Sequence, residues 1–377
     1  MSHELPLLPL LREEIRRSGP LSFYRFMELC LYHPQHGYYV SGRRKLGAGG
    51  DFYTSAHLAP VLARLLAQHL ERLWNILGRP ARFDLVELGP GDGSLASELL
   101  PWARYRFPEF FVSLHYLGVE QSPQGITRIE ERLREFSGHA RIAASNDWLS
   151  GQMAEEGLQG CVFANEFFDA LPVHWLVWRE EGWRERYVSI EEGKLRWIEG
   201  PPSDLKLVQE AERRFAPDLP AAERPDGWVA ELRPGARLWM EQIARRLERG
   251  QALIFDYGYT LDEWRQGRFS EGSTLGYRLH QVAYDLLANP GDQDLTAHVD
   301  FTELIETGEQ AGLRLRSLES QAQFLLGIGQ ADEFGEVFLG CASEEERLRR
   351  ARSLKTLILP QGMGETFRVL RMEKRLW

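Results

Sequence analysis

The chain has 377 residues, 43% of them hydrophobic and 27% charged, with a formal net charge of −10 at pH 7 and a pI near 5.6. This acidic balance argues against a large nucleic-acid surface, and no apolar stretch reaches the length of a membrane span, so we expect neither a nucleic-acid partner nor membrane insertion. The three cysteines lie far apart in apolar surroundings, which is typical of reduced core residues, and the first residues lack a signal-peptide cleavage site, which predicts a cytoplasmic location.

The first 80 residues are predicted to be mainly helical. Ser22 is a typical N-cap for the helix that follows in "FYRFMELCLYH". A longer amphipathic helix is predicted from about His57 to Leu77. We therefore treat residues 1–80 as an N-terminal helical region that precedes the sheet.

The stretch "DLVELGPGDGSLASELL" predicts a buried strand, a glycine-rich turn and a helix. In open α/β sheets such a turn lies at the carboxyl end of a strand, where glycines allow positive φ and the close approach of a ligand. The turn contains three glycines with the spacing G-x-G-x-G, namely Gly89, Gly91 and Gly93. Ser94 stands where a dinucleotide fingerprint needs a glycine, and the carboxylate of Glu87 would repel phosphate and attract an ammonium or sulfonium group. The combination favours S-adenosylmethionine (SAM) as cofactor.

Two further strand ends carry polar residues. "VSLHYLGVEQSP" predicts a second strand that ends at Glu120, before a helix from about Pro123 to Phe136, and an acid at this place can bond both ribose hydroxyls of an adenosyl group. "RIAASNDWL" predicts a third short strand that ends near Asn146 and Asp147, which could bond the adenine amino group. Each acid alone is more often a solvated surface residue, but polar groups at successive strand ends indicate one shared site.

The fourth strand, in "GCVFANEFFDALPV", is predicted to end in a segment suited to a methyl acceptor. Methyl transfer from SAM depends mainly on positioning the nucleophile, and a guanidinium would be held by forked hydrogen bonds from carboxylates, a role that suits Glu166 and Asp169. Phe167 and Phe168 could exclude water or stack on the acceptor, and Asn165 is assigned to the cofactor. In the structural alternative, the aromatic rings belong to the core and Asp169 caps a turn.

The rest of the chain completes an α/β pattern around an insertion. "HWLVWREEGWRERYVSIEEGKLRWIEG" predicts a small antiparallel meander followed by a helix, which makes residues 174–234 an inserted α+β segment and a candidate substrate lid. Residues 81–173 form the first half of the cofactor-binding core. Residues 235–377 supply the second half, with a helix at Gly235–Arg249, the strand "QALIFDYGY", a helix at Phe301–Ala311, the strand "LRLRSLES", two helical stretches, and "ETFRVLRMEKR" as a final edge strand.

Several weaker candidates follow the fifth strand. Asp256 and Tyr257 could line the acceptor pocket, although "DYG" is equally typical of a strand-end turn. His280 and His298 lie in long loops predicted to close over the site, where a histidine could take the proton that the acceptor nitrogen loses. A lone histidine is more often structural. Ligand spacings such as H-E-x-x-H are absent from the sequence, and we expect no metal.

The chain resembles the MidA family, SAM-dependent methyltransferases of bacteria and mitochondria that include a complex I assembly factor methylating an arginine. The matching stretches, spread over Gly37–Phe367, are "GYYVSGRRKLGAGGDFYTS", "VELGPGDGSL", "ANEFFDALPVHWL", "DYGYT", "DLTAHVDF" and "MGETF". The resemblance implies a Rossmann-like class I methyltransferase sheet, SAM as cofactor with S-adenosylhomocysteine as product, a protein as acceptor, and a contact of Asp51 with SAM. The chain departs from the family pattern at Ala56, His57 and Asp92.

The sequence thus predicts an α/β methyltransferase that acts on an arginine side chain of a protein, and a homodimer is compatible with it. A methyltransferase for a small molecule would instead have a closed apolar pocket. A non-enzymatic SAM-binding assembly factor would need Glu87 and Glu120 but not Glu166. A nicotinamide oxidoreductase is disfavoured by Ser94.

Overall fold

A computed structural model describes residues 5–40, 54–151, 157–180, 182–216, 220–279 and 281–376. The predictions for Asp51 and His280 lie outside these residues. The chain folds into two compact units, each described by itself: unit 1 comprises Met1–Arg43, Asp169–Leu238 and Gly258–Glu303, and unit 2 comprises Arg44–Phe168, Trp239–Tyr257 and Leu304–Trp377. Within the described ranges, no helix is both long and apolar enough to cross a membrane.

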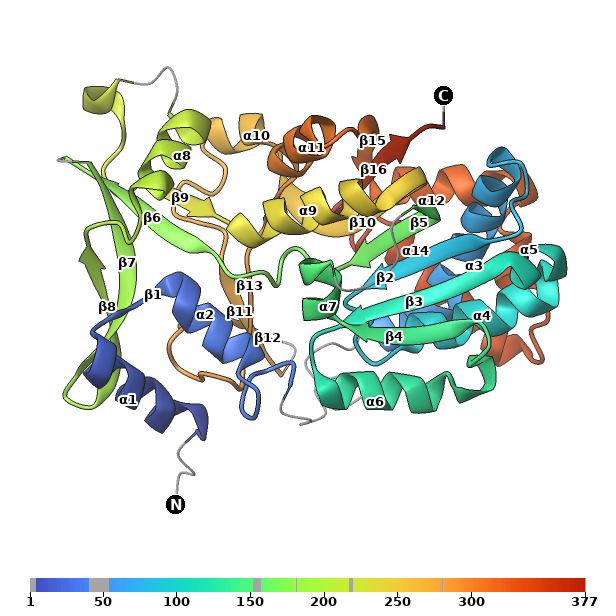
Figure 1. The fold of residues 1–377 in the computed structure, drawn as a ribbon, viewed down its shortest axis with the longest axis horizontal. Coiled ribbons are helices and arrows are strands. Elements are labelled where there is room, and N and C mark those ends of the chain that lie inside the picture. The colour runs from blue at the N-terminus through green and yellow to red at the C-terminus, as the bar shows by residue number, and fades with distance from the viewer. Residues whose placement is uncertain are drawn as a thin grey trace. The chain divides into compact units, whose positions relative to one another are not determined.

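The central sheet of unit 2 has the strand order β15-β16-β10-β5-β2-β3-β4 (Figure 1). Five neighbouring strands are parallel, and they follow the 3-2-1-4-5 order of doubly wound sheets. This confirms the predicted α/β fold. The strands are β2 (Phe83–Leu88), β3 (Leu114–Glu120), β4 (Ala140–Ala144), β5 (Leu158–Asn165), β10 (Leu247–Tyr259), β15 (Arg314–Ser320) and β16 (Phe367–Lys374).

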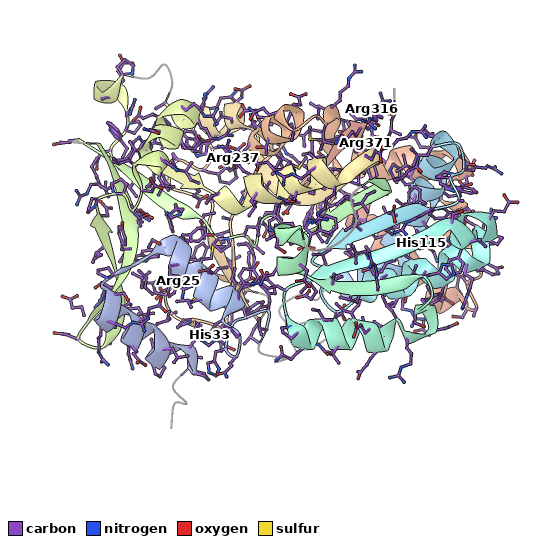
Figure 2. All side chains as sticks on the ribbon, in the orientation of Figure 1. Arg25, His33, His115, Arg237, Arg316 and Arg371 are labelled. Atoms are coloured by element: carbon purple, nitrogen blue, oxygen red, sulfur yellow. The ribbon has the colours of Figure 1, made fainter. Side chains whose placement is uncertain are left out.

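The last strand is not the edge strand that was predicted. β16 pairs antiparallel with β10 on one side and with β15 on the other, so β15 forms the edge. Val369 and Leu370 are adjacent in the strand and point to opposite faces of the sheet, yet both are fully buried. Such burial on both faces is typical of an interior strand. Arg371, labelled in Figure 2, crosses to β15 through its bond to the Ser317 hydroxyl at 2.8 Å.

Helices of unit 2 share one hydrophobic core with the sheet, built from residues such as Leu65, Leu99, Phe163 and Phe255. The helix predicted from about His57 is confirmed and begins slightly earlier. Two predicted helices end earlier than expected, because a 3₁₀ turn follows α6 and the long strand β10 begins directly after α9. The helices are α3 (Thr54–Ile76), α4 (Ser94–Arg106), α5 (Pro108–Ser113), α6 (Pro123–Arg132), α7 (Ser145–Ser150), α9 (Pro234–Arg246), α11 (Phe301–Gln310), α12 (Gln321–Gly329), α13 (Gly335–Phe338) and α14 (Glu344–Ile358).

Unit 1 is built on an antiparallel sheet with the order β1-β7-β6-β9, in which β8 also pairs with β7. The β6-β7-β8 meander confirms the prediction from period-two alternation. A second sheet has the order β12-β11-β13. The strands are β1 (Leu21–Ser22), β6 (His174–Arg179), β7 (Gly182–Glu191), β8 (Lys194–Gly200), β9 (Val229–Leu232), β11 (Leu275–Arg278), β12 (Gln281–Ala283) and β13 (Asp294–Thr296). A short strand, β14 (Val299–Asp300), pairs parallel with the end of β10 instead.

The helices of unit 1 include α1 (Leu7–Ser18), α2 (Phe23–Tyr32), α8 (Leu205–Phe215) and α10 (Leu261–Arg265). The Ser22 hydroxyl accepts a hydrogen bond from the backbone N–H of Arg25, which confirms the predicted N-cap of α2. One face of α2 is buried with Phe26 and Cys30 among the core residues, while the exposed Arg25 (Figure 2) pairs with Glu14 of α1 at 2.9 Å. The amphipathic pattern therefore fixes which face of α2 meets the core.

Candidate active site

The glycine loop joins β2 to α4 in unit 2. Gly89, Gly91 and Gly93 have φ values of +65°, +61° and +76°, a region that side chains rarely adopt. A Cβ atom at Gly89 would lie 2.8 Å from the ring of Phe167, and one at Gly93 would lie 3.0 Å from Ile129. At Gly91 a Cβ atom would meet nothing within 4 Å. Gly91 therefore borders open space at the turn, as a ligand cradle requires.

Glu87 lies beside this loop at the end of β2, with 6% of its surface exposed. Its Oε2 accepts a hydrogen bond of 2.6 Å from the Tyr116 hydroxyl. Burial raises the pKa of Glu87 to about 7, against the opposing effect of that bond and with a small contribution from Asp92. A cation placed next to Glu87 would stabilise its charged form, which fits the ammonium or sulfonium group of SAM.

Glu120 lies at the end of β3, as predicted. Its Oε1 accepts two backbone N–H bonds of 2.9 Å, from Gln121 and Ser122, while Oε2 has no hydrogen-bond partner in the described part of the chain. Burial raises the pKa of this carboxyl and the two N–H bonds oppose that shift. The side chain is thus fixed by its own turn, with one oxygen left for the ribose hydroxyls of a bound adenosyl group.

The third strand end differs from the prediction. β4 ends at Ala144, and Asn146 and Asp147 lie exposed in the first turn of α7 rather than in the strand. The Ala-Ser-Asn segment begins a helix here because Ser145 is buried and the apolar Trp148 packs fully inside the unit. Both residues still follow the carboxyl end of β4, on the sheet edge that Glu87 and Glu120 share, because these strands are parallel. Their contact with adenine stays a prediction.

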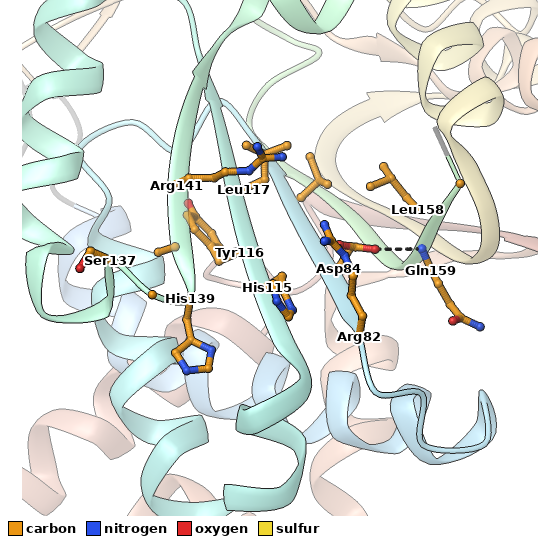
Figure 3. A pocket seen from close by; sticks show the side chains of 14 residues that line it. Arg82, Asp84, His115, Tyr116, Leu117, Ser137, His139, Arg141, Leu158 and Gln159 are labelled. Carbon is orange, nitrogen blue, oxygen red and sulfur yellow. Dashed lines mark hydrogen bonds and ion pairs between the residues drawn. The ribbon is translucent and has the colours of Figure 1, made fainter. Parts of the chain in front are cut away.

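A cavity of about 580 Å³ lies at the opposite edge of the same sheet, at the amino ends of β2 to β5 (Figure 3). Asp84 is held there by Arg82 at 2.8 Å and by the backbone N–H of Gln159 at 3.1 Å. His115 and Arg141 also line it. Cofactors of open α/β sheets bind at the carboxyl ends of the strands, so we expect SAM at the other edge of the sheet and do not assign this cavity to it.

The predicted acceptor segment begins where β5 ends. Glu166 has a φ of +48°, in the left-handed region that is unusual for a residue with a side chain. Its backbone N–H bonds to the carbonyl of Phe255 at 3.0 Å, and the amide of Asn165 donates to its carboxylate at 3.2 Å. The chain therefore turns sharply at Glu166, one residue after the strand end that borders the glycine loop.

Asp256 stabilises this turn from the neighbouring strand β10. It is completely buried, and its two oxygens accept backbone N–H bonds from Phe168 at 3.0 Å and Tyr257 at 2.9 Å. These bonds fit the strand-end turn that was the alternative for Asp256, and its place in the lining of the acceptor pocket stays a prediction. The half-buried Tyr257 lies against Phe367 of β16, with ring centroids 5.5 Å apart. A cross-strand partner of this kind cannot be read from the spacing of residues in one strand.

The two phenylalanines of the segment have different surroundings. Phe168 is fully buried, as expected if this aromatic ring belongs to the core. Phe167 is half-buried, and its ring lies between Gly89 of the glycine loop and Trp239 of α9, 5.0 Å away with the ring planes at 88°. Phe167 therefore contacts the loop directly, and Trp239, which was not predicted, supports it.

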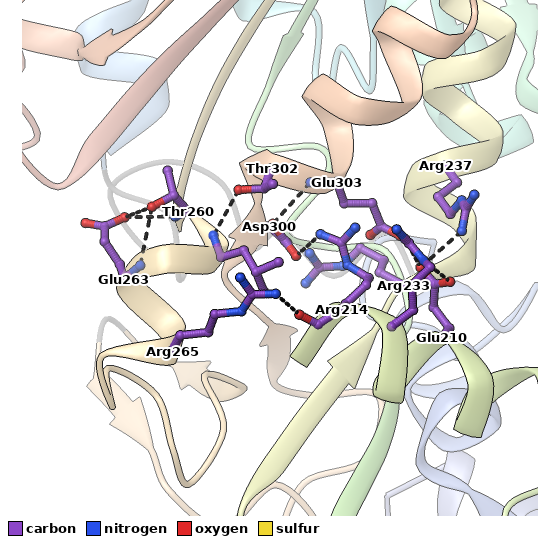
Figure 4. Close-up of polar contacts among 12 residues, drawn as sticks. Glu210, Arg214, Arg233, Arg237, Thr260, Glu263, Arg265, Asp300, Thr302 and Glu303 are labelled. Carbon is purple, nitrogen blue, oxygen red and sulfur yellow. Dashed lines mark hydrogen bonds and ion pairs between the residues drawn. The ribbon is translucent and has the colours of Figure 1, made fainter. Parts of the chain in front are cut away.

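In unit 1, Asp169 and the "DLTAHVDF" segment are joined through the backbone. The carbonyl of Asp169 accepts a bond of 3.0 Å from the N–H of Ala297. Arg233, which was not predicted, donates to the carbonyls of Leu171, Ala297 and His298 at 3.2, 2.7 and 3.2 Å. Beside it, Arg214 and Asp300 form a buried ion pair of 2.6 Å (Figure 4). These contacts hold both family motifs in fixed register, and Asp169 itself is 2% exposed.

His298 does not have the properties of the predicted base. Burial lowers its pKa to about 4, with smaller effects from Arg268 and Arg233, and its ring packs against Phe269 at 4.5 Å. A base with that pKa accepts a proton weakly at neutral pH. Packing against an aromatic ring is typical of a structural histidine. In the described ranges, no three His, Cys, Asp or Glu side chains are grouped so that they could hold a metal ion.

Comparisons with known proteins identify the family to which the chain belongs. Residues 65–318 match the model of a family described as S-adenosyl-L-methionine-dependent methyltransferases. The chain is 31% identical to protein arginine methyltransferase NDUFAF7, mitochondrial, of Danio rerio, over 96% of this chain and 85% of that protein. It is 30% identical to the Homo sapiens protein of the same name, over 97% of this chain and 83% of that protein.

A solved structure extends the similarity to the cofactor. A Burkholderia thailandensis protein in a crystal structure bound to S-adenosyl-homocysteine has a TM-score of 0.82 and 29% identity, over 98% of this chain and 92% of that chain. S-adenosyl-homocysteine is the product form of SAM, and Glu87, Gly91 and Glu120 are the residues predicted to contact this cofactor. Because a family model matches residues 65–318 and relatives align along nearly all of the chain, the chain belongs to this family of SAM-dependent methyltransferases.

Proposed function

We propose that the protein methylates an arginine side chain of a partner protein. The observation that carries the proposal is the left-handed backbone of Glu166, at the end of the strand next to the glycine loop. Such a conformation costs about 1–3 kcal/mol and persists where surrounding contacts enforce it, often at functional sites. Here the Phe255 carbonyl and the buried Asp256 enforce it.

The chemistry of a guanidinium acceptor matches this carboxylate. A guanidinium is planar and carries five N–H donors, so a carboxylate can accept two of them and fix the orientation of the reacting nitrogen. Bound SAM supplies the methyl group. In the transfer the nitrogen gains a bond to the methyl carbon, the carbon–sulfur bond of the sulfonium breaks with its electron pair left on sulfur, and one proton leaves the nitrogen for solvent water. Glu166 is proposed to position the acceptor, together with Asp169 three residues along the chain.

The names of the relatives support the same acceptor, since those proteins are called protein arginine methyltransferases. The names of those relatives also place them in mitochondria. For this chain we propose a cytoplasmic location. A protein substrate follows from an arginine acceptor.

The test uses the purified protein, radiolabelled SAM and a lysate from its own source. We expect one labelled protein, with the label on methylarginine after acid hydrolysis and on one arginine by mass spectrometry. Boiled enzyme and excess S-adenosylhomocysteine are the controls. Label confined to a small molecule, or to lysine, would contradict the proposal and favour the alternatives.

A further inference from the structure

The cavity at the amino ends of β2 to β5 is not part of the methyl-transfer site described above (Figure 3). Its lining residues all belong to unit 2. Its volume of about 580 Å³ is in the range of pockets that hold small organic ligands. The chemistry of the lining therefore indicates which kind of ligand the cavity suits.

Strand register places much of the lining in rows on one face of the sheet. Val86 of β2 is paired with Leu117 of β3, and Leu117 is paired with Arg141 of β4. Two residues nearer the amino ends, Asp84 is paired with His115. Side chains alternate between the faces of a strand, so these five residues share the face on which the cavity lies. Val86 and Leu117 are buried and form the apolar floor of the cavity.

A buried carboxylate holds a guanidinium at the wall of the cavity. Asp84 is 6% exposed, and its Oδ1 accepts a bond of 2.8 Å from Nε of Arg82, while its Oδ2 accepts a bond of 3.1 Å from the backbone N–H of Gln159. The two terminal nitrogens of Arg82 have no hydrogen-bond partner among the residues that the structure describes. Asp84 thus fixes Arg82 through Nε and leaves the terminal fork, which matches a phosphate or a carboxylate, available to a ligand.

The cavity carries an excess of positive charge. Two arginines, Arg82 and Arg141, line it, against a single carboxylate among the described lining residues. A second carboxylate comes near, since Oε2 of Glu248 would lie 2.9 Å from a Cβ atom at Gly157, but Glu248 pairs with Arg375 at 3.2 Å. In a chain whose formal net charge is −10, this local excess favours an anionic ligand.

Two histidines of the lining add groups that bond to a ligand. Nδ1 of His115 lies 2.9 Å from the carbonyl of Ser113, and Nδ1 of His139 lies 3.0 Å from the carbonyl of Leu114. A carbonyl only accepts, so each Nδ1 carries a proton, and each Nε2 has no hydrogen-bond partner in the described part of the chain. Such an Nε2 accepts a bond from a ligand hydroxyl or, when protonated, donates one to an anion.

We propose that this cavity is a second ligand site of the protein, which binds a small organic anion. The phosphate or carboxylate group of the ligand is bound by the terminal nitrogens of Arg82 and attracted by Arg141, and its apolar body lies on the apolar floor. An inorganic ion would leave that floor exposed to water, so an organic body adds affinity by burying it. The inference goes beyond the proposed function, because it depends on neither the methyl acceptor nor SAM.

The experiment measures binding by calorimetry, with S-adenosylhomocysteine at saturation so that the cofactor site is occupied. The probes are phenyl phosphate and benzoate, which combine an anionic group with an aromatic ring. Inorganic phosphate and benzyl alcohol each offer only one of the two parts. We expect at least one ring-bearing anion to bind about tenfold tighter than inorganic phosphate and benzyl alcohol. The tighter of phenyl phosphate and benzoate identifies the anionic group that the site prefers.

Variants locate this binding in the cavity. Arg82→Gln should weaken binding of the tighter probe about tenfold or more, because a charged hydrogen-bond donor is lost. Arg141→Gln should also weaken it, and it carries the test if Arg82→Gln does not fold. Arg349→Gln is the matched control, because the exposed Arg349 of α14 pairs with Glu345 at 3.3 Å and does not line the cavity. Thermal unfolding checks the fold, and S-adenosylhomocysteine affinity should stay at the wild-type value in all three variants.

Three outcomes would overturn the inference. Neither ring-bearing anion binds more tightly than inorganic phosphate, or a folded Arg82→Gln variant binds with wild-type affinity, or Arg82→Gln and Arg349→Gln lose the same affinity. The last outcome would show a general effect of surface charge. Each of them leaves the proposed function standing, since labelling of arginine in the lysate is measured separately.

Discussion

We expect the buried carboxyl group of Glu87 to make SAM binding sensitive to pH. Because burial raises its pKa to about 7, the group is mostly protonated below that pH and must lose a proton when a cation binds beside it. We expect SAM affinity to increase from about pH 5.5 to about pH 8 and then to level off. Calorimetry in buffers of different ionisation enthalpy should detect the released proton. The Glu87→Gln variant should lack this dependence, and an equal slope in both proteins would contradict the assignment.

Glu166 should matter for transfer and not for the cofactor. Glu166→Gln keeps the shape but replaces one acceptor oxygen with a donor that faces the guanidinium, so the rate should fall at least about a hundredfold, as expected for a loss of about 3–5 kcal/mol. SAM affinity, measured by titration of the same samples, should be nearly unchanged. Asp169→Asn should act similarly, and the double variant should lose less than the sum.

A matched control for Glu166 exists in the chain. Glu192 is an exposed glutamate in the β7–β8 turn with a similar φ of +50°, and Glu192→Gln should leave the rate unchanged. If Glu166→Gln also methylates at the wild-type rate, the carboxylate does not hold the acceptor.

Residues that act alone were easier to predict than residues that act through a partner. The places of Glu87 and Glu120 near strand ends could be predicted because each directly follows or ends an apolar strand run, whereas their contacts with SAM stay predictions. Tyr116, which bonds Glu87, and Asp256, which holds the Phe168 backbone, depend on how strands pair. Strand register is set by contacts distant in sequence, so these roles required the structure.

The role of Gly91 in the loop between β2 and α4 can be tested against Gly78, a glycine outside that loop. Gly91 and Gly78 both have positive φ, and a Cβ atom at either would meet nothing within 4 Å. An alanine at either position should therefore cost a similar conformational strain, about 1–2 kcal/mol. We expect Gly91→Ala also to lose SAM affinity, because its Cβ would enter the space of the ligand, whereas Gly78→Ala should bind normally. Thermal unfolding and SAM titration measure the two effects, and equal affinities would argue against the cradle.

Elements with a strong periodic pattern were predicted well, including α3, the β6-β7-β8 meander and the parallel strands. The errors occurred where neighbours decide the outcome. The prediction placed β16 at the edge of the sheet, because its position between β10 and β15 depends on strand pairing. The adjacent apolar residues Val369 and Leu370, both of which are buried, were a sign in the sequence of an interior strand. The end of β4 was misplaced because the buried Trp148 draws the chain into a helix there.

Glu303 connects the stability of the folded protein to pH. Burial raises its pKa to about 7 next to the Arg214–Asp300 pair, with Arg214 opposing the shift (Figure 4). The ordinary pKa of this group is 4.5. The raised pKa therefore contributes to the free energy of unfolding fully below about pH 4.5, and this contribution is lost as the pH rises through 7.

We therefore expect Glu303→Gln to be more stable than the wild type at about pH 8, by at most about 3 kcal/mol, and to match it at about pH 4. Thermal unfolding across this range is the measurement. The exposed Glu309 in the same helix is the control, because Glu309→Gln should shift the midpoint little at any pH. A destabilised Glu303→Gln at alkaline pH would show that the charged form is the favoured one.

The interior position of β16 has a consequence for biosynthesis. β10 and β15 are both translated before β16, yet the strand that joins them is residues 367–374. Until that segment leaves the ribosome, β10 has an unpaired edge, and β15 has no partner in the sheet. Because open strand edges attract other chains, a nascent protein stalled before β16 is an aggregation hazard and a natural client of chaperones. Completion of this sheet is therefore a step that follows translation of its last strand.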